Sequence, residues 1–417
     1  MPDTQDVIVV GGGAIGACCA LELAQAGASV TLLERGAELA WACSAGNLGM
    51  ICPGHSAPIA SVTSLKLGLK NVFRSDGAFY LKPDPTLIPW IARFTAACRP
   101  ERVKRGVDVM RELSVASLER HAALAEAGLE TTFVRRGMAN AAETEEGLAL
   151  LEGEAEENAK AGLRVEVLRG DAVRELEPEY GPDVCGAVYY PDEAHCDPAR
   201  FVHAVGAAAQ GAGVDIRSRV EVLRLLHTGA RVHGVETTAG RLHADHVVLA
   251  AGAWTSKLAE QAAVFVPVTG GKGYHVDLPA EPTTTTIPTL FIETRVGITP
   301  MPGRVRIGGT LELSGLDESV SMRRVEAIVK GATRAIPSLA GRPRQSVWRG
   351  LRPCSPDGVP IIGESKRMAN LVIATGHAHM GLALSPVTGR LVREIVRGEE
   401  PSHDLSPLSP DRFQALL

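Results

Sequence analysis

Three glycines and one glutamate near the start of the chain have the types and spacing that bind a dinucleotide. Gly11, Gly13 and Gly16 form a GxGxxG pattern, and Glu34 follows 18 residues after the last glycine. The first glycine permits a tight turn, the second lets a pyrophosphate approach the backbone, and the third lets a helix pack closely. A glutamate at that position accepts hydrogen bonds from ribose hydroxyls and disfavours a 2′-phosphate. The motif therefore predicts FAD or NAD rather than NADP.

The segments around these residues have the pattern of a β-α-β unit. Residues 7–10 are β-branched and apolar, as in a strand buried on both faces. Residues 17–26 have helical composition and end at Gly27, and residues 29–33 predict a second strand that leads to Glu34. A pyrophosphate would lie at the helix N-terminus, where free amides and the helix dipole favour anions. The alternative is a glycine turn that serves packing alone.

Histidines and cysteines give weaker signals. His377 and His379 stand two apart in a glycine-rich segment and could chelate a metal, but no third ligand is evident, so no metal site is expected. None of the eight cysteines forms a CxxC pair, which excludes a zinc motif or dithiol motif of that spacing. Reduced thiols in a cytosolic protein are expected.

Length, charge and hydropathy limit the classes of protein. A chain of 417 residues with 45% hydrophobic residues predicts two structural domains with large cores. A net charge of −5 gives no reason to expect nucleic acid as a partner. The first six residues lack the basic start of a signal peptide, and no apolar run is long enough for a membrane-spanning helix. A cytoplasmic location is therefore expected.

Three further segments resemble flavoproteins with two dinucleotide folds. Residues 248–254 (VLAAGAW) look like their strand-and-glycine segment, and Arg219-Val220 resembles the place where a backbone N–H and C=O read the adenine edge. Residues 376–386 resemble their flavin-ring loop. The order of these features is similar to that of the D-amino-acid oxidase (DAO) superfamily of FAD-dependent oxidoreductases over nearly the full length. This resemblance implies an α/β fold, with a Rossmann-type FAD-binding domain and a second, antiparallel-sheet substrate domain.

Within this superfamily the chain looks most similar to D-amino-acid dehydrogenases and glycine oxidases. Residues 44–49 (SAGNLG) resemble the dehydrogenases' Ser-x-x-Asn-Ala-Gly loop, with Leu48 where alanine is usual, and residues 273–275 resemble their GYH segment. Residues 350–363 resemble their GLRP…DG.P.IG block, which implies that Arg352 clamps the substrate carboxylate. A guanidinium suits this task because it forms two parallel hydrogen bonds to a carboxylate. The alternative for Arg352 is an ion pair with Asp357.

Two neighbouring residues compete for a place at the substrate. Tyr274 could donate its hydroxyl to the substrate carboxylate or simply pack in the sheet, and His275 lies on the opposite face if the segment is a strand. Only one of the two can face the flavin, and Tyr274 is preferred. The catalytic candidates are therefore Arg352, Tyr274 and His275. The residues expected at the cofactor are Gly11, Gly13, Ala14, Ile15, Gly16, Glu34, Arg35, Ser44, Asn47, Leu48, Val220, Ala251, Gly252, Gly350, Arg352, His379, Met380, Gly381 and Leu382.

The expected domains are discontinuous in the sequence. The FAD-binding domain is predicted from residues 1–90, 188–264 and 340–417, and the substrate domain from residues 91–187 and 265–339. Within the latter, short apolar runs across residues 264–315 alternate with Gly, Pro and Thr, which indicates an antiparallel sheet.

The resemblance implies oxidative deamination of a D-amino acid by hydride transfer from Cα to flavin N5. The expected substrates include cyclic or N-substituted amino acids such as D-proline or hydroxyproline. Noncovalent FAD is expected, and the electron acceptor is left open between a quinone, an electron-transfer protein and O2. Two alternatives remain: a glycine- or sarcosine-type amine oxidase that uses O2, and the flavin subunit of a heteromeric amine dehydrogenase. An NAD-binding dehydrogenase is disfavoured because the flavin-type loop would have no role in it.

Residues 87–105 combine apolar side chains with five basic ones. Such a segment could lie on the anionic inner face of a membrane. A helix that faces the protein core with a charged outer face is the favoured interpretation.

Overall fold

The computed structural model describes residues 5–56, 58, 60, 79–81, 84–281 and 284–416. The predicted β-α-β unit is present as β1 (Asp6–Val10), α1 (Ala14–Gln25) and β2 (Ser29–Glu34), with β1 and β2 parallel. Val7 and Val9 enter the core on one face of β1, whereas Ile8 and Val10 enter the core on the other face. The expectation of a strand buried on both faces is confirmed.

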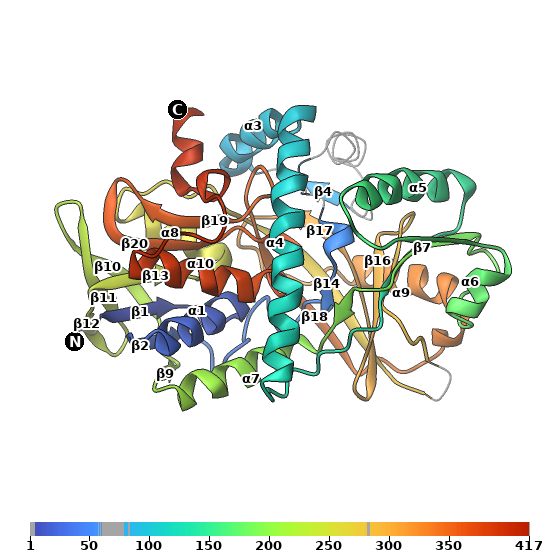
Figure 1. Cartoon of the computed structure of the whole chain (residues 1–417), viewed down its shortest axis with the longest axis horizontal. Helices are drawn as coiled ribbons and strands as arrows, with labels where there is room; N and C mark the ends of the chain where they lie inside the picture. Colours follow the sequence, from blue (N-terminus) through green and yellow to red (C-terminus); the bar gives the residue numbers. More distant parts are fainter. Residues whose placement is uncertain are drawn as a thin grey trace.

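The first sheet carries β1 and β2 at its centre. Its strands run in the order β10-β11-β20-β13-β1-β2-β9, with β12 beside β11 and β19 beside β20. Helix α1 contacts both α7 (Pro198–Gly211) and α10 (Ser385–Arg397) on one side of the sheet (Figure 1). The other strands are β9 (Asp215–Ser218), β10 (Val222–Thr228), β11 (Arg231–Thr237), β12 (Gly240–His243), β13 (His246–Leu249), β19 (Ile361–Ser365) and β20 (Met368–Thr375).

A second sheet is mostly antiparallel, in the order β18-β14-β17-β16-β15-β5-β7-β6, with β4 beside β17. Helix α9 (Met322–Ala335) packs its apolar residues on β14, β16 and β17, and α5 (Glu145–Lys160) packs on β5 and β7. The antiparallel sheet predicted for residues 264–315 is therefore present. Its strands are β4 (Phe79–Leu81), β5 (Met138–Ala142), β6 (Glu166–Arg169), β7 (Gly186–Tyr190), β14 (Thr269–Pro279), β15 (Thr289–Phe291), β16 (Val296–Met301), β17 (Arg304–Leu313) and β18 (Ser346–Cys354).

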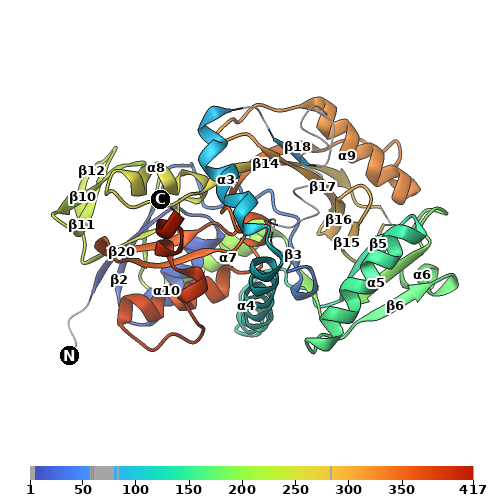
Figure 2. The same ribbon diagram turned by 90° about the horizontal axis from the view of Figure 1, so that it is seen from above.

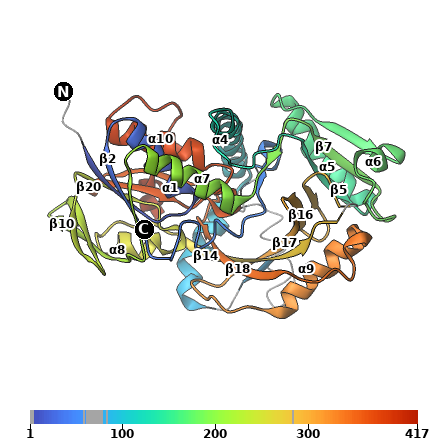
Figure 3. The ribbon, with the colours of Figure 1, turned by 90° about the horizontal axis from the view of Figure 1, so that it is seen from below.

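The long helix α4 (Pro100–Glu126) stands between the two sheets, as Figures 2 and 3 show. Its residues Met110, Leu113 and Leu118 pack in the core of the first sheet. The smaller elements are β3 (Met50–Ile51), which pairs with β8 (Ala194–His195), the short helices α6 (Asp171–Leu176) and α8 (Thr255–Glu260), and the 3-10 turns η1 (Pro53–His55), η2 (Pro85–Leu87), η3 (Gly252–Trp254), η4 (Pro337–Leu339), η5 (Ala378–Met380), η6 (Ser406–Leu408) and η7 (Pro410–Leu416).

The predicted domain boundaries differ from the strand pairing in two places. Residues 346–354 were assigned to the FAD-binding domain, but they form β18, which pairs with β14 in the second sheet. Residues 188–190 also fall in the second sheet, as part of β7. Helix α4 differs in the opposite direction, because it was predicted in the substrate domain and packs on the first sheet. Local sequence pattern does not indicate the sheet against which each of these elements packs.

Helix α3 (Ile88–Ala97) forms the apolar part of the segment considered for a membrane surface. Trp90 and Phe94 are buried, and the Trp90 indole Nε1 donates to the carbonyl of Cys354 at 3.0 Å. The guanidinium of Arg93 lies over the ring of Phe265, 4.7 Å from its centre. The interpretation as a core-facing helix is therefore confirmed for these side chains. Among the described helices, none is both long enough and apolar enough to span a bilayer.

Candidate active site

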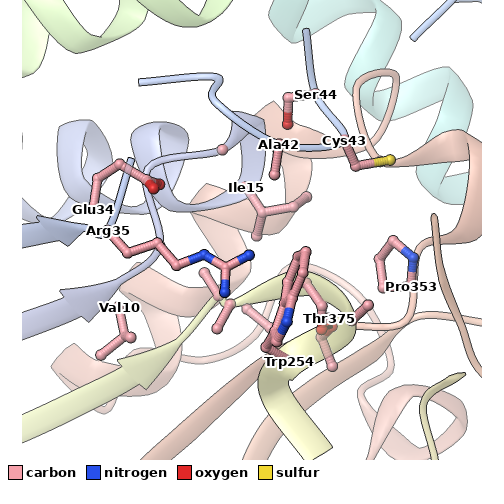
Figure 4. Close-up of a pocket in the computed structure, with 18 of the residues that line it drawn as sticks. Val10, Ile15, Glu34, Arg35, Ala42, Cys43, Ser44, Trp254, Pro353 and Thr375 are labelled. Atoms are coloured by element: carbon pink, nitrogen blue, oxygen red, sulfur yellow. Dashed lines mark hydrogen bonds between the residues drawn. The ribbon is translucent and has the colours of Figure 1, made fainter. Parts of the chain in front are cut away.

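A cavity of about 320 Å³ runs along the ends of β1, β2, β13 and β20. Thirteen of the predicted cofactor residues line it, which places the nucleotide-type motif and the C-terminal turn around one space. They are Gly11, Gly13, Ala14, Ile15, Glu34, Arg35, Ser44, Asn47, Val220, Ala251, Gly252, Gly381 and Leu382. Figure 4 shows the middle of this cavity, with Ile15 and Ser44 on one side and Trp254 and Thr375 on the other.

The glycine turn leaves space where a side chain would collide with the backbone. Gly11 has φ +108°, and a Cβ there would lie 2.6 Å from the carbonyl oxygen of Ala250. A Cβ on Gly16 would lie 1.8 Å from the carbonyl oxygen of Gly11. Helix α1 has no acidic residue in its first turn, so its N-terminal amides keep a positive electrostatic potential. The cavity is therefore suited to an anion such as a pyrophosphate at the start of α1.

Glu34 is fixed by the same turn. Its Oε2 accepts a hydrogen bond from the amide of Gly12 at 2.7 Å, and its Oε1 accepts one from Gly36 at 2.6 Å. The carboxylate is thereby oriented at the edge of the cavity, where it can also accept hydrogen bonds from ribose hydroxyls.

Arg35 and Trp254 close the nucleoside end of the cavity. The Arg35 guanidinium lies 3.8 Å from the centre of the Trp254 ring, a cation–π contact that is visible in Figure 4. Trp254 was absent from the predicted site residues, although its position two residues after Gly252 in the same turn could have indicated it. The prediction for Val220 is partly wrong: its amide donates to the carbonyl of Glu34 at 2.9 Å and is not free for an adenine edge.

A second, small cavity of about 20 Å³ adjoins the large one, since Cys43 and Asn47 line both. Arg352 borders this small cavity and donates from Nη1 to the carbonyl of Thr310 at 2.8 Å. Its guanidinium lies over Gly273, where a Cβ would be only 2.2 Å from Nη1. The complete lining is Cys43, Gly46, Asn47, Gly273, Tyr274, Trp348, Gly350 and Arg352.

The alternative role of Arg352 as the partner of Asp357 is wrong. Asp357 forms a bidentate ion pair with Arg412, in which Nε donates to Oδ2 at 2.8 Å and Nη2 donates to Oδ1 at 3.0 Å. Within the described part of the chain, no ion pair engages Arg352, whose only side-chain hydrogen bond goes to the backbone of Thr310. This arrangement leaves most of its donors available to a carboxylate ligand.

The preference for Tyr274 over His275 stays a prediction, because Tyr274 is part of the small cavity's lining and His275 is not, although the Tyr274 side chain points away from Arg352. The side chain of Tyr274 packs in the core beneath α9, and its hydroxyl donates to Glu312 Oε2 at 3.3 Å. Burial, together with the charge of Glu312, raises the pKa of Tyr274 to about 12. In the pairing of β14 with β18, Tyr274 alternates with His275, which lies opposite Trp348 on the face that carries Arg352. The predicted alternation is therefore present, and His275 is the member of the pair that shares a face with Arg352.

His275 is a neutral, buried side chain stacked on Trp348, with ring centres 5.1 Å apart. Burial, reinforced by the nearby Arg306 guanidinium, lowers the pKa of His275 to about 4. Its Nδ1 is 3.1 Å from the carbonyl oxygen of Gly46 and therefore carries the ring proton and donates it.

Two histidines of the C-terminal turn have different surroundings. His377 Nε2 is 2.9 Å from the hydroxyl of Thr388, whereas His379 lies 6.0 Å, centre to centre, from the ring of His55. Burial lowers the pKa of both His377 and His379 to about 3, and that of His55 to about 4. These rings are neutral at physiological pH. Among the described residues, no group of three metal-ligating side chains is present.

The chain's relatives agree with this geometry. Residues 6–395 match the family described as FAD dependent oxidoreductase (DAO). The chain belongs to the DAO family. It is 32% identical to a D-amino acid dehydrogenase of Paramagnetospirillum magneticum, with 99% of each chain covered, and 30% identical to one of Bradyrhizobium diazoefficiens, with 98% of each covered. A crystal structure of glycine oxidase from Geobacillus kaustophilus superposes with a TM-score of 0.80 at 26% identity and covers 98% of this chain and 99% of that one.

FAD is therefore the dinucleotide of this DAO-family enzyme, and the cavity fits it. A pyrophosphate suits the glycine turn at α1, the ribose suits Glu34, and the Arg35–Trp254 pair marks the adenosine end. The opposite end of the large cavity reaches Cys43, Asn47 and Pro353, beside the small cavity. The reactive ring of the cofactor belongs at that end, because it must meet the substrate.

Six predicted cofactor residues do not line the large cavity. Gly350 and Arg352 line the small one, and Gly16 is buried against the glycine turn. The Leu48 side chain packs on the second sheet at Gly297 and Gly308. Met380 is a core residue, and His379 reaches the site through its carbonyl, which accepts from Asn47 Nδ2 at 3.0 Å. Cavity-lining residues that the sequence did not single out include Ala42, Cys43, Lys257, Leu351, Pro353 and Thr375.

Proposed function

We propose that this enzyme is a dehydrogenase that oxidises a small D-amino acid at its Cα–N bond. The observation that carries this proposal is Arg352, a guanidinium without a carboxylate partner among the described residues, beside the cofactor cavity. The full-length relatives named D-amino acid dehydrogenase support the choice of substrate class.

Arg352 would hold the substrate carboxylate. The Thr310 carbonyl occupies one donor of Nη1, which fixes the plane of the guanidinium and leaves an edge for two parallel hydrogen bonds. Gly273 is required beneath it, because any side chain there would displace the guanidinium. With the carboxylate fixed, only one hydrogen of Cα can point at the cofactor, so the position of the side-chain pocket sets the accepted enantiomer.

FAD supplies the acceptor for the electron pair of the Cα–H bond. The product imine is hydrolysed by water, so the balanced reaction converts amino acid, oxidised FAD and water into 2-oxo acid, ammonia and reduced FAD. Trp348 lines the small cavity, and the ring of His275 stacks on it, so this buried pair would exclude bulk water from that side of the cavity.

The substrate amine must be uncharged before the electron pair can leave. His55, His275 and His379 have pKa values near 3 to 4 and are poor acceptors for an ammonium proton. We therefore propose that the substrate reacts as the free amine and that kcat/KM rises with pH until the amine of the amino acid in solution is deprotonated.

Noncovalent attachment of FAD is part of this proposal. Burial raises the pKa of Cys43 to about 11 and that of Cys354 to about 12, so the two thiols nearest the small cavity are neutral and weakly nucleophilic. The final electron acceptor is a quinone or an electron-transfer protein, and peripheral contact with a membrane follows only in the first case.

The test is anaerobic bleaching of the purified protein's visible flavin band by D-amino acids, L-amino acids, glycine, sarcosine and hydroxyproline isomers. Bleaching by D-amino acids, with slow recovery in air and fast recovery with a quinone analogue, is expected. A yellow protein that no compound bleaches would overturn the amino-acid assignment and favour a flavin subunit that needs a partner chain.

A glycine- or sarcosine-type oxidase is the second candidate. The similarity to glycine oxidase and the small volume of the substrate-side cavity, about 20 Å³, both favour a substrate with little or no side chain. Bleaching by glycine or sarcosine, followed by rapid recovery in air with formation of hydrogen peroxide, would select this candidate.

A further inference from the structure

Three successive carbonyl groups of the loop at residues 44–49 are held by side chains of the second sheet. Arg306 Nη1 donates to the carbonyl of Ala45 at 2.7 Å and to that of Asn47 at 2.9 Å. His275 Nδ1 donates to the carbonyl between them, that of Gly46, at 3.1 Å. The loop lines both cavities, so these contacts join the substrate sheet to the cofactor site.

A buried carboxylate orients the arginine. Asp277 accepts from Arg306 Nε at 2.8 Å and from Nη2 at 3.0 Å, which leaves Nη1 for the loop. Arg306 and Asp277 face each other across the β14–β17 pair, and both are buried. We call Arg306, Asp277 and His275 the carbonyl anchor.

The direction of the loop amides follows from the planar peptide group, in which the C=O and the next N–H point opposite ways. With the carbonyls of Ala45 and Asn47 directed at Arg306, the amides of Gly46 and Leu48 point away from the anchor. Within the described residues, neither amide has a hydrogen-bond acceptor in the protein. Gly46 lines the small cavity, and Asn47, beside Leu48, lines both cavities at the end where the cofactor ring belongs.

We infer that Arg306 and His275 are positioning residues that keep the Gly46 and Leu48 amides aimed at the ring end of the cofactor cavity and thereby raise the reduction potential of bound FAD. A hydrogen bond to the carbonyl oxygen of a peptide group also polarises that group and makes its N–H a stronger hydrogen-bond donor. The reduced flavin ring carries more negative charge than the oxidised ring, so it gains more from these donors. This role does not depend on the identity of the substrate.

The experiment measures the midpoint potential of the bound flavin by equilibration with redox dyes, together with FAD affinity by titration of the apoprotein. Arg306→Met should weaken FAD binding by about tenfold or more, since it removes two charge-assisted hydrogen bonds to the loop. The potential should become more negative. If a variant weakens the binding of reduced FAD tenfold more than the binding of oxidised FAD, the midpoint potential falls by about 30 mV.

Arg304→Met is the matched control. Arg304 also pairs with Asp277, with Nε at 3.3 Å from Oδ2, but its described contacts include no carbonyl of the loop. The control should leave the potential and the visible spectrum unchanged. Equal shifts in Arg304→Met and Arg306→Met would overturn the inference, because the effect would then come from the buried charge rather than from the loop.

Two further variants keep the test decisive if Arg306→Met does not fold. His275→Ala removes the single donor to Gly46 and should lower the potential by a smaller amount, and His275→Gln, which restores an N–H donor, should recover part of the loss. A wild-type potential in both His275→Ala and Arg306→Lys would contradict the proposed role, because a lysine ammonium cannot bridge Asp277 and two carbonyls at once.

Discussion

The two cavities are built from different parts of the polypeptide. The cofactor cavity depends on backbone: glycines without a Cβ, helix amides and a turn that holds Glu34. The substrate-side cavity depends on side chains such as Arg352 and Trp348, which lie on one face of β18. A backbone-built site leaves a spacing pattern in the sequence, whereas a side-chain-built site depends on which face of a strand turns inward.

This difference predicts different responses to mutation. Replacing a glycine in the first region changes where the chain can run, so the cofactor itself should be lost. Replacing a side chain in the second region should leave a folded, yellow protein with altered chemistry. The following experiments test that contrast, from the largest expected effect to the smallest.

Gly11→Ala should abolish FAD binding. The residue adopts φ +108°, and its Cβ would lie 2.6 Å from the Ala250 carbonyl oxygen. Backbone strain of about 1–3 kcal/mol together with this collision predicts a loss of affinity of about two orders of magnitude or more. Gly27→Ala is the control, since Gly27 has φ +86° but no atom within 4 Å of its Cβ position. A Gly11→Ala protein that purifies with stoichiometric FAD would refute the backbone-built view.

Arg352→Met should lower kcat/KM by about 10²- to 10³-fold while the protein keeps its FAD, because two charge-assisted hydrogen bonds to the carboxylate are lost. Arg352→Lys should recover part of the activity through charge alone. The measurement is the rate of anaerobic flavin reduction, together with the dissociation constant of a simple carboxylate inhibitor. Unchanged inhibitor binding in Arg352→Met would remove the carboxylate clamp from the mechanism.

The pH dependence of stability should have a maximum near the ordinary pKa of histidine. Burial lowers the pKa of His275, His377 and His379, so the unfolded chain binds more protons below about pH 6.5 and stability falls on acidification from there toward pH 4. Burial raises the pKa of Glu193 to about 8, so its native proton is retained while the unfolded carboxyl is ionised, and stability falls as pH rises from about 4.5 to 8.

Glu193→Gln isolates the second of these effects. A single group contributes a slope of up to about 1.4 kcal/mol per pH unit. The variant should therefore gain stability relative to the wild type as pH rises from 5 to 8, as measured by chemical denaturation at fixed FAD. If the free energy of unfolding varies with pH in the same way for both proteins, Glu193 is ionised in the native state.

Tyr274→Phe should have the smallest effect on catalysis, within about threefold in kcat/KM, because the hydroxyl bonds to Glu312 rather than facing the small cavity. Loss of this buried hydrogen bond should cost about 1 kcal/mol of stability. Steady-state kinetics and thermal melting of the same preparation provide the comparison. A large loss of turnover with an unchanged melting temperature would return Tyr274 to a catalytic role.

Much of the first region could be predicted from the sequence. The β1-α1-β2 unit and thirteen cavity-lining positions follow from local pattern and from the resemblance to the DAO family, which carries the glycine spacing and the C-terminal turn. Helix α7 at Pro198–Gly211 also has a strong local signal, since it begins after the capping residue Asp197.

Other elements had no local signal. β5 (Met138–Ala142) contains no β-branched or aromatic residue, yet it forms a strand because all five residues are buried between β15 and β7. The pairing of β18 with β14 was not predicted for a similar reason, since it joins segments about 75 residues apart in the sequence. Long-range pairing of this kind has no signature within either segment.

The sequence by itself determined the dinucleotide turn and the acid that follows it, because both depend on residue type and short spacing, and its resemblance to the DAO family pointed to Arg352. Only the tertiary structure decided that Arg352 avoids Asp357, that His275 and not Tyr274 shares its face, and that Arg306 reaches the loop at Ala45 and Asn47. The physical reason is that strand register and the packing of α9 select the inward face, and both arise from contacts between distant segments.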